Sequence, residues 1–463
     1  MLKNILKVLL SNFIVTAVGL INSFVFPAIM SVESYSAYHE FTLYVSYINV
    51  CHLGIATGMF VYYGGKDYKS IDRARYKGEI SLILCVLAFF SVMGIALAWW
   101  MQSPLIFKVA LAIYPVCMIA SFKAMYQAWN RFTAYSVINV VTTVALTAGV
   151  LIYYLLWGEV SGSVIIAWYL IIQYSVFIYF MLEYLVFTRK VKREPMFSKQ
   201  NLDTTKTGFL IMMGNYIMLL FHALDKQFVN TLYTAYDFAM YSFASSTTNI
   251  MNVFITAMST PFYPRLAKQD MDKKQLNMLK EMLFIFGAYS GCAYFAVSFI
   301  VEHFIPKYQD SLFVVYLFFA TFPATAVINV LYVNLYKVTR QVKKYIGTLV
   351  GILVVSFVLN TVAVLLKGGF VGISAATLCT YYIWLLYSQR DFQDIVISKR
   401  DCIYLVFFAV VYLACIKVSN VIVGFVIYGI VITIIDFVFY KDSLGEAISM
   451  VCAKFLKKGK VNK

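Results

Sequence analysis

The chain has 463 residues, of which 62% are apolar and only 13% are charged, and its mean hydropathy is +0.78. A typical soluble domain carries about 45–50% apolar and about 25% charged residues. The composition therefore excludes a water-soluble globular protein, a disordered chain and a secreted disulfide scaffold. The net charge of +16 does not indicate a nucleic-acid partner, because the basic residues lie in short clusters between long apolar runs.

Apolar runs long enough to cross a bilayer as helices recur along the whole chain; such a helix needs about 20 residues. We expect an all-α, polytopic membrane protein of fourteen transmembrane helices with both termini on one side of the membrane. The runs lie near 9–30, 38–63, 79–100, 105–129, 133–157, 162–187, 208–232, 236–261, 281–301, 311–335, 345–366, 370–388, 402–417 and 420–439.

The distribution of lysine and arginine supports this topology. With both termini in the cytoplasm, 32 of the 38 basic residues fall on the cytoplasmic side, and only Lys307, Lys367 and Lys417 fall in outer loops. An excess of lysine and arginine is typical of cytoplasmic loops. The pattern predicts a multi-pass protein with cytoplasmic N- and C-termini.

The layout of the spans suggests two similar halves. The longest inner connection, 188–207, separates spans 1–6 from spans 7–12, and a proline interrupts the fourth span of each half, at Pro115 and Pro323. Proline kinks a helix, and interrupted spans at matching positions indicate the substrate site of a transporter. Coincidence is the alternative, because prolines are common in membrane helices. We expect an N-terminal lobe (1–195), a C-terminal lobe (196–390) around a central cavity, and two added spans with a basic tail (391–463).

Polar residues form stripes along several spans. Asn22 lies beside such a stripe in the first span, Asn215 lies on one in the seventh, and Asn249 and Asn252 lie on one in the eighth. Asparagine, serine and threonine side chains often join helices by hydrogen bonds. Helix–helix hydrogen bonding is thus one interpretation of the stripes. Because the stripes recur in several spans, we favour a second interpretation, in which they line a shared, water-filled cavity.

Ionisable residues inside spans are costly and are candidates for function. Asp225 and Lys226 are adjacent, so their side chains point about 100° apart and meet different partners. Asp225 is a candidate for carrying a proton or cation or for pairing with a basic group, and Lys226 and His222 are candidates for facing an anionic substrate. Lys108 lies near a span end, where it has room to reach the headgroups. No histidine or cysteine spacing predicts a metal site, and no motif predicts catalysis or a cofactor.

Several short stretches resemble a known family. They are Leu224-Asp225-Lys226, Tyr241-Ser242-Phe243-Ala244, Pro261-Phe262-Tyr263-Pro264-Arg265-Leu266, Ser34-Tyr35-Ser36-Ala37-Tyr38, Gly54-Ile55-Ala56 and Tyr62-Tyr63. Together with the layout of spans, they resemble the Wzx-type polysaccharide transporters, the lipid-linked oligosaccharide flippases of the multidrug/oligosaccharidyl-lipid/polysaccharide exporter superfamily. The resemblance implies a V-shaped bundle with alternating access, a bacterial inner-membrane location and undecaprenyl-diphosphate-linked glycans as substrate.

These observations lead to one main hypothesis and two rivals. The main hypothesis is a flippase, not an enzyme, that moves oligosaccharide repeat units to the outer leaflet for lipopolysaccharide O-antigen or capsule biosynthesis. Lys226, His222, Arg265 and Lys108 would attract the diphosphate or acidic sugars. Expected partners are the bilayer, a polysaccharide polymerase with its chain-length machinery, and a proton or sodium gradient. The first rival is a cation-coupled multidrug exporter, and the second is a membrane enzyme or assembly scaffold.

Overall fold

The computed structural model describes residues 2–66, 68, 71–267 and 271–461; the side chains of 2–9, 447–461 and seven residues of the helix Asn249–Ala267 are not described. The described chain consists of helices joined by short connections and contains no strand, which confirms the predicted all-α fold class. Its internal contacts divide it into two compact units, Met1–Ala239 and Met240–Lys463. Each unit is described separately below.

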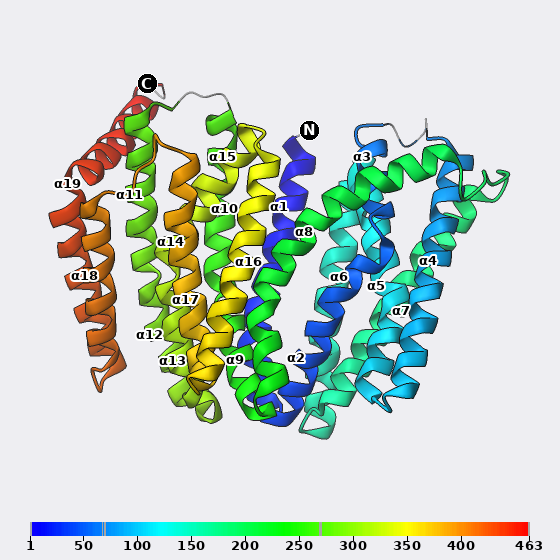
Figure 1. Cartoon of the computed structure of the whole chain (residues 1–463), viewed down its shortest axis with the longest axis horizontal. Helices are drawn as coiled ribbons and strands as arrows, with labels where there is room; N and C mark the ends of the chain where they lie inside the picture. Colours follow the sequence, from blue (N-terminus) through cyan, green and yellow to red (C-terminus); the bar gives the residue numbers. More distant parts are fainter. Residues whose placement is uncertain (1, 67, 69–70, 268–270, 462–463) are drawn as a thin grey trace. The chain divides into compact units, whose positions relative to one another are not determined.

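The first unit contains helices α1 to α8, of which α8 runs obliquely to α4, α5, α6 and α7 (Figure 1). They are α1 (Leu2–Ile29), α2 (Val32–Tyr47), α3 (Ile55–Tyr63), α4 (Arg73–Trp100), α5 (Pro104–Ala128), α6 (Phe132–Trp157), α7 (Gly162–Thr188) and α8 (Lys199–Leu232), with the short 3₁₀ helix η1 (Ile48–His52) and the first part of α9 (Ala235–Thr247).

Side-chain caps determine where several of these helices begin. The hydroxyl oxygens of Ser103, Ser161 and Ser198 accept hydrogen bonds from the first turns of α5, α7 and α8. The Asp72 carboxylate does the same for α4. Such caps satisfy backbone N–H groups that have no partner within the helix. The predicted span starts therefore agree with the structure to within a few residues at α5 and α7, where an apolar run follows the cap directly.

The second predicted span is broken. The chain bends by 62° between Val32–His52 and Ile55–Tyr63. Leu53 and Gly54 both have positive φ values, of 48° and 77°. A glycine is needed at position 54 because a Cβ there would overlap the backbone of Gly208 and Phe209 on α8. The break thus allows α3 to pack directly against α8.

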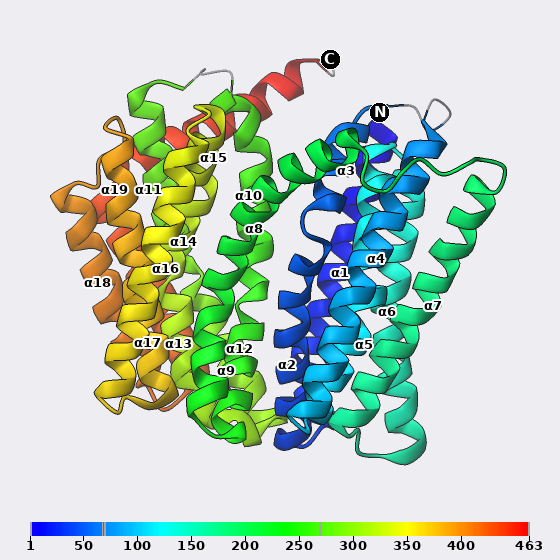
Figure 2. The same ribbon diagram turned by 45° about the vertical axis from the view of Figure 1, so that its right-hand side comes forward.

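The second unit contains the remainder of α9 and ten further α-helices (Figure 2). They are α10 (Asn249–Ala267), α11 (Lys273–Tyr289), α12 (Gly291–Phe304), α13 (Leu312–Ala320), α14 (Phe322–Val327), α15 (Val333–Val338), α16 (Val342–Leu365), α17 (Gly369–Ser388), α18 (Lys399–Ile416) and α19 (Val421–Val461), with the 3₁₀ helices η3 (Pro306–Ser311) and η5 (Gln389–Asp391) and the π-helix η4 (Ile328–Tyr332).

The two prolines expected to interrupt spans have different surroundings. Pro323 lies in the first turn of α14, directly after a 40° bend between Pro306–Ala320 and Phe322–Val338. Its backbone is packed so closely on Gly287 of α11 that a Cβ on Gly287 would overlap it. Pro115 is buried inside α5, which continues as one α-helix from Pro104 to Ala128.

Within the described residues, length and composition identify ten helices able to cross a membrane, or up to twelve if each of the two bent pairs is one span. The predicted spans 236–261 and 402–417 correspond to α9–α10 and α18, which are helical but are not among those twelve. The count of fourteen stays a prediction. The expected lobe boundaries at 195 and 390 also stay a prediction; α8, assigned there to the second lobe, packs within the first unit.

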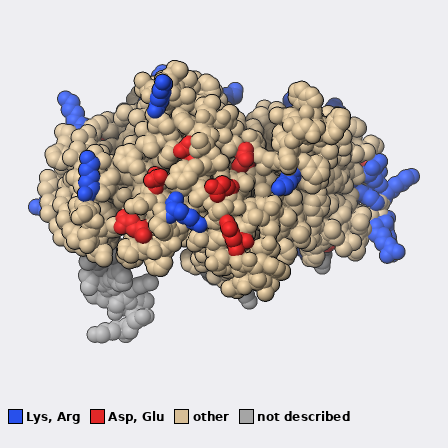
Figure 3. All heavy atoms as spheres, turned by 90° about the horizontal axis from the view of Figure 1, so that it is seen from below, with Lys and Arg blue, Asp and Glu red and all other residues tan. Residues whose placement is uncertain are grey.

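Large apolar side chains cover the outside of the long helices, as they do in lipid-embedded proteins. Leu155 is 80% exposed and Trp99 is 78% exposed. Trp99, Trp100 and Trp157 are exposed at helix ends, where aromatic residues are typical of the headgroup level. Trp129, at the end of α5, is instead buried among other aromatic rings. The end view in Figure 3 shows only scattered charged side chains.

Candidate functional site

A polar seam joins α2 to α8 within the first unit. The Tyr47 hydroxyl of α2 donates a hydrogen bond to Gln227 Oε1 of α8 (3.3 Å). The Asn230 amide of α8 donates in the opposite direction, to Glu40 Oε1 (3.2 Å). Hydrogen-bonded polar side chains of this kind hold membrane helices together. They keep the facing surfaces of α2 and α8 in register.

Lys226 lies on this seam together with two histidines. His222 precedes it by one helical turn on α8, and the charge of Lys226 acts electrostatically on both His222 and His39 of α2. The His39 ring packs on Tyr35, with ring centroids 4.2 Å apart. We name His39, His222 and Lys226 the Lys226 cluster. His222 is exposed, and His39 and Lys226 are half-buried.

Two further residues predicted to belong to the site, Asp225 and Asn215, also lie on α8. Asp225 is buried, and its carboxyl group interacts with the Lys226 charge. Asn215 is exposed and lies two turns before His222, on the same side of the helix. The structure thus brings together Asn215, His222, Asp225 and Lys226 on one helix, as their spacing in the sequence predicts.

The other predicted site residues lie elsewhere. Asn22 of α1 exchanges hydrogen bonds with Thr147 of α6, at 2.9 and 3.1 Å. Lys108 is half-buried in the first turns of α5. Asn249 and Asn252 are exposed on α10, in the second unit. The side chain of Arg265 lies outside the described residues.

The sequence does not single out His39, because no spacing typical of metal ligands surrounds it, yet in the structure it lies beside Lys226. Its signal was its position, since an ionisable side chain inside an apolar span is a candidate for function. Lys123 is a further ionisable residue within the predicted span 105–129. Its Nζ donates a hydrogen bond to Asn139 Oδ1 of α6, 2.9 Å away.

A buried ion pair at the start of α4 was also missed. Arg75 Nε lies 3.0 Å from Glu79 Oε1, and both side chains are buried. The other arginine nitrogens donate to Gln200 (3.2 Å) and Thr204 (2.7 Å) of α8, while the Tyr63 hydroxyl donates to Glu79 (2.8 Å). In the sequence, Glu79 is the first residue of the predicted span 79–100 and Arg75 precedes that span. Their contacts show that they join α3, α4 and α8.

The described residues hold no group of three histidine, cysteine, aspartate or glutamate side chains suited to a metal ion. The α2–α8 seam itself presents one ammonium group and two imidazoles. An ammonium and two imidazoles supply N–H donors, which is the donor set that binds phosphate or carboxylate groups.

Comparison with solved structures identifies the fold. Over 94% of this chain and 99% of the other, the structure is similar to the lipid II flippase MurJ in an inward closed conformation, with a TM-score of 0.68 and 13% sequence identity. The chain therefore has the fold of that flippase. A MATE transporter, ClbM in complex with Rb⁺, is matched over 88% of this chain and 96% of the other with a TM-score of 0.42 and 12% identity.

Sequence comparison adds one relative. An uncharacterized membrane protein of Haemophilus influenzae is 24% identical over 234 residues, which are 48% of this chain and 54% of that protein. This chain thus spans about half the length of the curated relative it matches. No family model matches the chain.

Proposed function

We propose that the protein is a flippase that moves undecaprenyl-diphosphate-linked oligosaccharide repeat units from the cytoplasmic to the outer leaflet of a bacterial inner membrane. Transport would occur by alternating access and would supply repeat units for O-antigen or capsule. Two findings support this proposal. The fold is that of a protein named for flipping a lipid, and in the first unit the charge of Lys226 lies beside two histidines, one on α2 and one on α8.

The Lys226 cluster is the observation that carries the proposal. A diphosphate is the most strongly charged part of such a substrate, and it has to pass through a region of low dielectric constant. There an ammonium group attracts an anion much more strongly than it does in water. Lys226 supplies that charge, and His39 and His222 supply further hydrogen-bond donors beside it.

The remaining polar residues are proposed to contact the sugars. Asn215, exposed two turns from His222, is suited to exchange hydrogen bonds with hydroxyl groups. We also propose Lys108 in the first unit, and Asn249, Asn252 and Arg265 in the second, as contacts along the transport route. Asp225 is our candidate for proton or sodium coupling, and a polysaccharide polymerase with its chain-length machinery is the proposed partner.

The proposal is tested in cells that lack the gene. Surface polysaccharide and the lipid-linked repeat units on each leaflet would be quantified. We expect loss of the polymer together with accumulation of the intermediate on the cytoplasmic leaflet, both reversed by the wild-type gene. Normal polysaccharide, combined with altered sensitivity to lipophilic cations, would overturn the proposal in favour of a drug exporter.

A further inference from the structure

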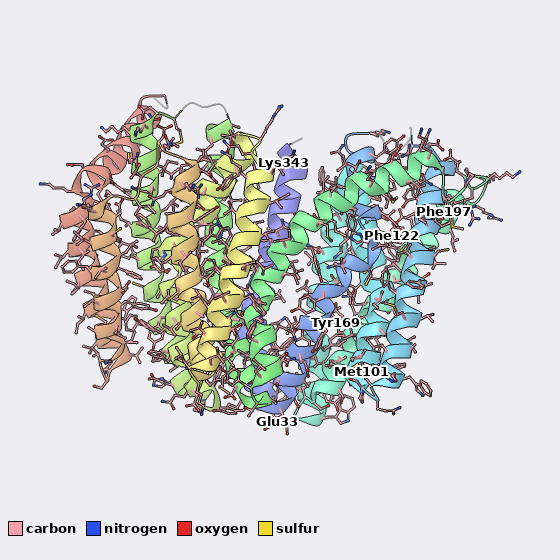
Figure 4. All side chains as sticks on the ribbon, in the orientation of Figure 1. Glu33, Met101, Phe122, Tyr169, Phe197 and Lys343 are labelled. Carbon is pink, nitrogen blue, oxygen red and sulfur yellow. The ribbon has the colours of Figure 1, made fainter. Side chains whose placement is uncertain are left out.

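A second positively charged side chain lies inside a membrane helix of the first unit, on other helices than the Lys226 cluster. Lys123 is on α5, five residues before that helix ends at Ala128. Phe122, the residue before it, is labelled in Figure 4 and marks this part of α5. Lys123 is half-buried, and its Nζ donates a hydrogen bond to Asn139 Oδ1 of α6 (2.9 Å). A lysine within a membrane helix is costly and is therefore a candidate for function.

No carboxylate neutralises Lys123 in the described part of the chain. None of the six ion pairs between described residues includes it, and no charged neighbour among those residues acts on its ammonium group. The buried Arg75, by contrast, is paired with Glu79. Basic side chains within membrane helices pair with an acidic group or mark the path of a substrate or ion. An anionic ligand would supply the counter-charge that Lys123 lacks.

Asn139 adds hydrogen-bond donors beside this ammonium group. Its Oδ1 accepts from Lys123, so the two N–H groups of its Nδ2 are left for another partner. Nδ2 makes no hydrogen bond to any described residue, and it is not among the fully buried side-chain atoms that lack one. The ammonium group itself has three N–H groups, of which Asn139 uses one. Charged and neutral N–H donors side by side are the combination that binds phosphate oxygens.

The surroundings of this pair are open on one side and turned away from the lipid on the other. On α5, Ala120, one turn before the lysine, is exposed, and Gln127, one turn after it, is half-buried. Residues three or four apart share a helix face, so this face of α5 is not fully covered. On α6, the exposed Val137 and Val141 each lie about 200° around the helix from Asn139. The Asn139 amide is therefore on the face of α6 opposite these two valines.

We propose that Lys123 and Asn139 bind a phosphate group of a polyprenyl-diphosphate-linked substrate where it enters the first unit. This inference rests on the proposed function. In the topology predicted from the basic residues, the end of α5 is cytoplasmic, which is the side from which such a substrate would be taken. Lys226 lies six residues before α8 ends at Leu232, and that end is predicted to be on the outer side. Lys123 is thus the first phosphate contact and Lys226 a later one.

Native mass spectrometry of the purified full-length protein tests the proposal. Undecaprenyl diphosphate, phosphatidylglycerol and inorganic pyrophosphate would each be added, and the retained ligand would be measured. We expect Lys123→Gln to retain about tenfold less undecaprenyl diphosphate than the wild type, a loss typical of one charge-assisted contact. Lys417→Gln, at an exposed position beyond the end of α18, is the matched control and should change nothing. Equal, Lys123-dependent retention of phosphatidylglycerol would overturn the proposal in favour of a phospholipid site, and retention of pyrophosphate alone in favour of a free anion.

Asn139→Asp separates phosphate binding from helix packing, and it decides the question if Lys123→Gln does not fold. An aspartate keeps an acceptor for Lys123 and so preserves the contact of α5 with α6. Its negative charge replaces the N–H donors and repels a phosphate group. We expect this variant to unfold at no lower denaturant concentration than the wild type and to retain about tenfold less undecaprenyl diphosphate. Wild-type retention in this variant would overturn the proposal, because a hydrogen bond that only joins the helices predicts that result.

The failure of this inference is distinguishable from the failure of the proposed function. Loss of retention in Lys226→Gln, with wild-type retention in Lys123→Gln and Asn139→Asp, would overturn the inference and leave the proposed function standing. Retention that depends on Lys123 and Asn139, in a protein whose absence from cells leaves surface polysaccharide normal, would support the phosphate site and overturn the proposed function.

Discussion

Lys280 of α11 and Asp401 of α18 form a buried ion pair: Lys280 Nζ lies 2.6 Å from Asp401 Oδ2, and the side chains are 2% and 0% exposed. The hydroxyl of Tyr440 and the amide of Ser398 each donate to the carboxylate at 2.8 Å, and Lys280 also donates to the Val396 carbonyl. These hydrogen-bond partners of the pair are all groups of the protein itself. The contact joins the start of α18 and the kink of α19 to the body of the second unit.

Removing one member of this pair should destabilise the protein strongly. In Lys280→Met, the Asp401 charge would remain buried without its counter-charge. We expect the free energy of unfolding to fall by about 3–5 kcal/mol, measured by denaturation of the protein in detergent. The control is Lys273→Met, whose exposed pair with Asp394 should contribute about 0–1 kcal/mol. Similar losses in the two variants would contradict the interpretation.

The same pair should make stability depend on pH. Asp401 directly precedes the predicted span 402–417. Burial alone would raise the pKa of Asp401, but Lys280, the Ser398 amide and Tyr440 lower this pKa below its ordinary value of 3.8. A carboxyl group with a lowered folded-state pKa stabilises the protein above its unfolded pKa, and this contribution is lost as the pH falls towards the folded pKa.

The measurement is the unfolding midpoint of the wild type and of Asp401→Asn between about pH 7 and about pH 3. We expect the wild type to be more stable at neutral pH and the difference to shrink below about pH 4. A difference that grows as the pH falls would have the wrong sign and would show that Asp401 is not held as a carboxylate.

The contact of α3 with α8 should depend on glycine. A Cβ on Gly208 would overlap the backbone of Gly54 and Gly58. We expect Gly208→Ala to cost about 1–3 kcal/mol of stability, the usual range for overpacking. Gly351→Ala is the matched control, because nothing lies within 4 Å of the added carbon. In the middle of α16 that change should be neutral or stabilising by up to about 1 kcal/mol; equal destabilisation of both variants would contradict the prediction.

Substitution of Asn22 distinguishes a role in helix packing from a role in substrate contact. Its hydrogen bonds to Thr147 favour a role in joining α1 to α6. We expect Asn22→Ala to lower the stability by about 0.6 kcal/mol, the mean for such bonds in membranes, and to leave polysaccharide export unchanged. Asn12→Ala, at an exposed position of the same helix, is the control. Loss of export without loss of stability would instead indicate that Asn22 contacts the substrate.

Much of the helical framework is predictable from the sequence. Predicted spans 133–157 and 345–366 correspond to α6 (Phe132–Trp157) and α16 (Val342–Leu365), because long apolar runs and polar turns mark helix positions directly. The break before α3 was not predictable in the same way. Leu53 adopts a positive φ there, which leucine rarely does, and only the neighbouring Gly54 is a local sign of it.

The candidate site was predictable only as far as it lies on one helix. Helical spacing placed His222 and Lys226 together, but no spacing relates Lys226 to His39, which lies on a helix far away in the sequence. The pairing of Lys280 with Asp401 could not be predicted from the sequence for another reason. Charged residues near span ends follow the positive-inside pattern, so the sequence does not distinguish a buried pair from a solvated loop.

Substitution of Lys226 tests the proposed transport function most directly. Cells lacking the gene would be supplied with the wild type, with Lys226→Gln or with Lys417→Gln, a control beyond the end of α18. Surface polysaccharide, inner-leaflet intermediate and the amount of inserted protein would be measured. We expect Lys226→Gln to insert normally, to lose the polymer and to accumulate the intermediate, while Lys417→Gln behaves as the wild type. Full restoration of the polymer by Lys226→Gln would contradict the assignment of the cluster to the substrate.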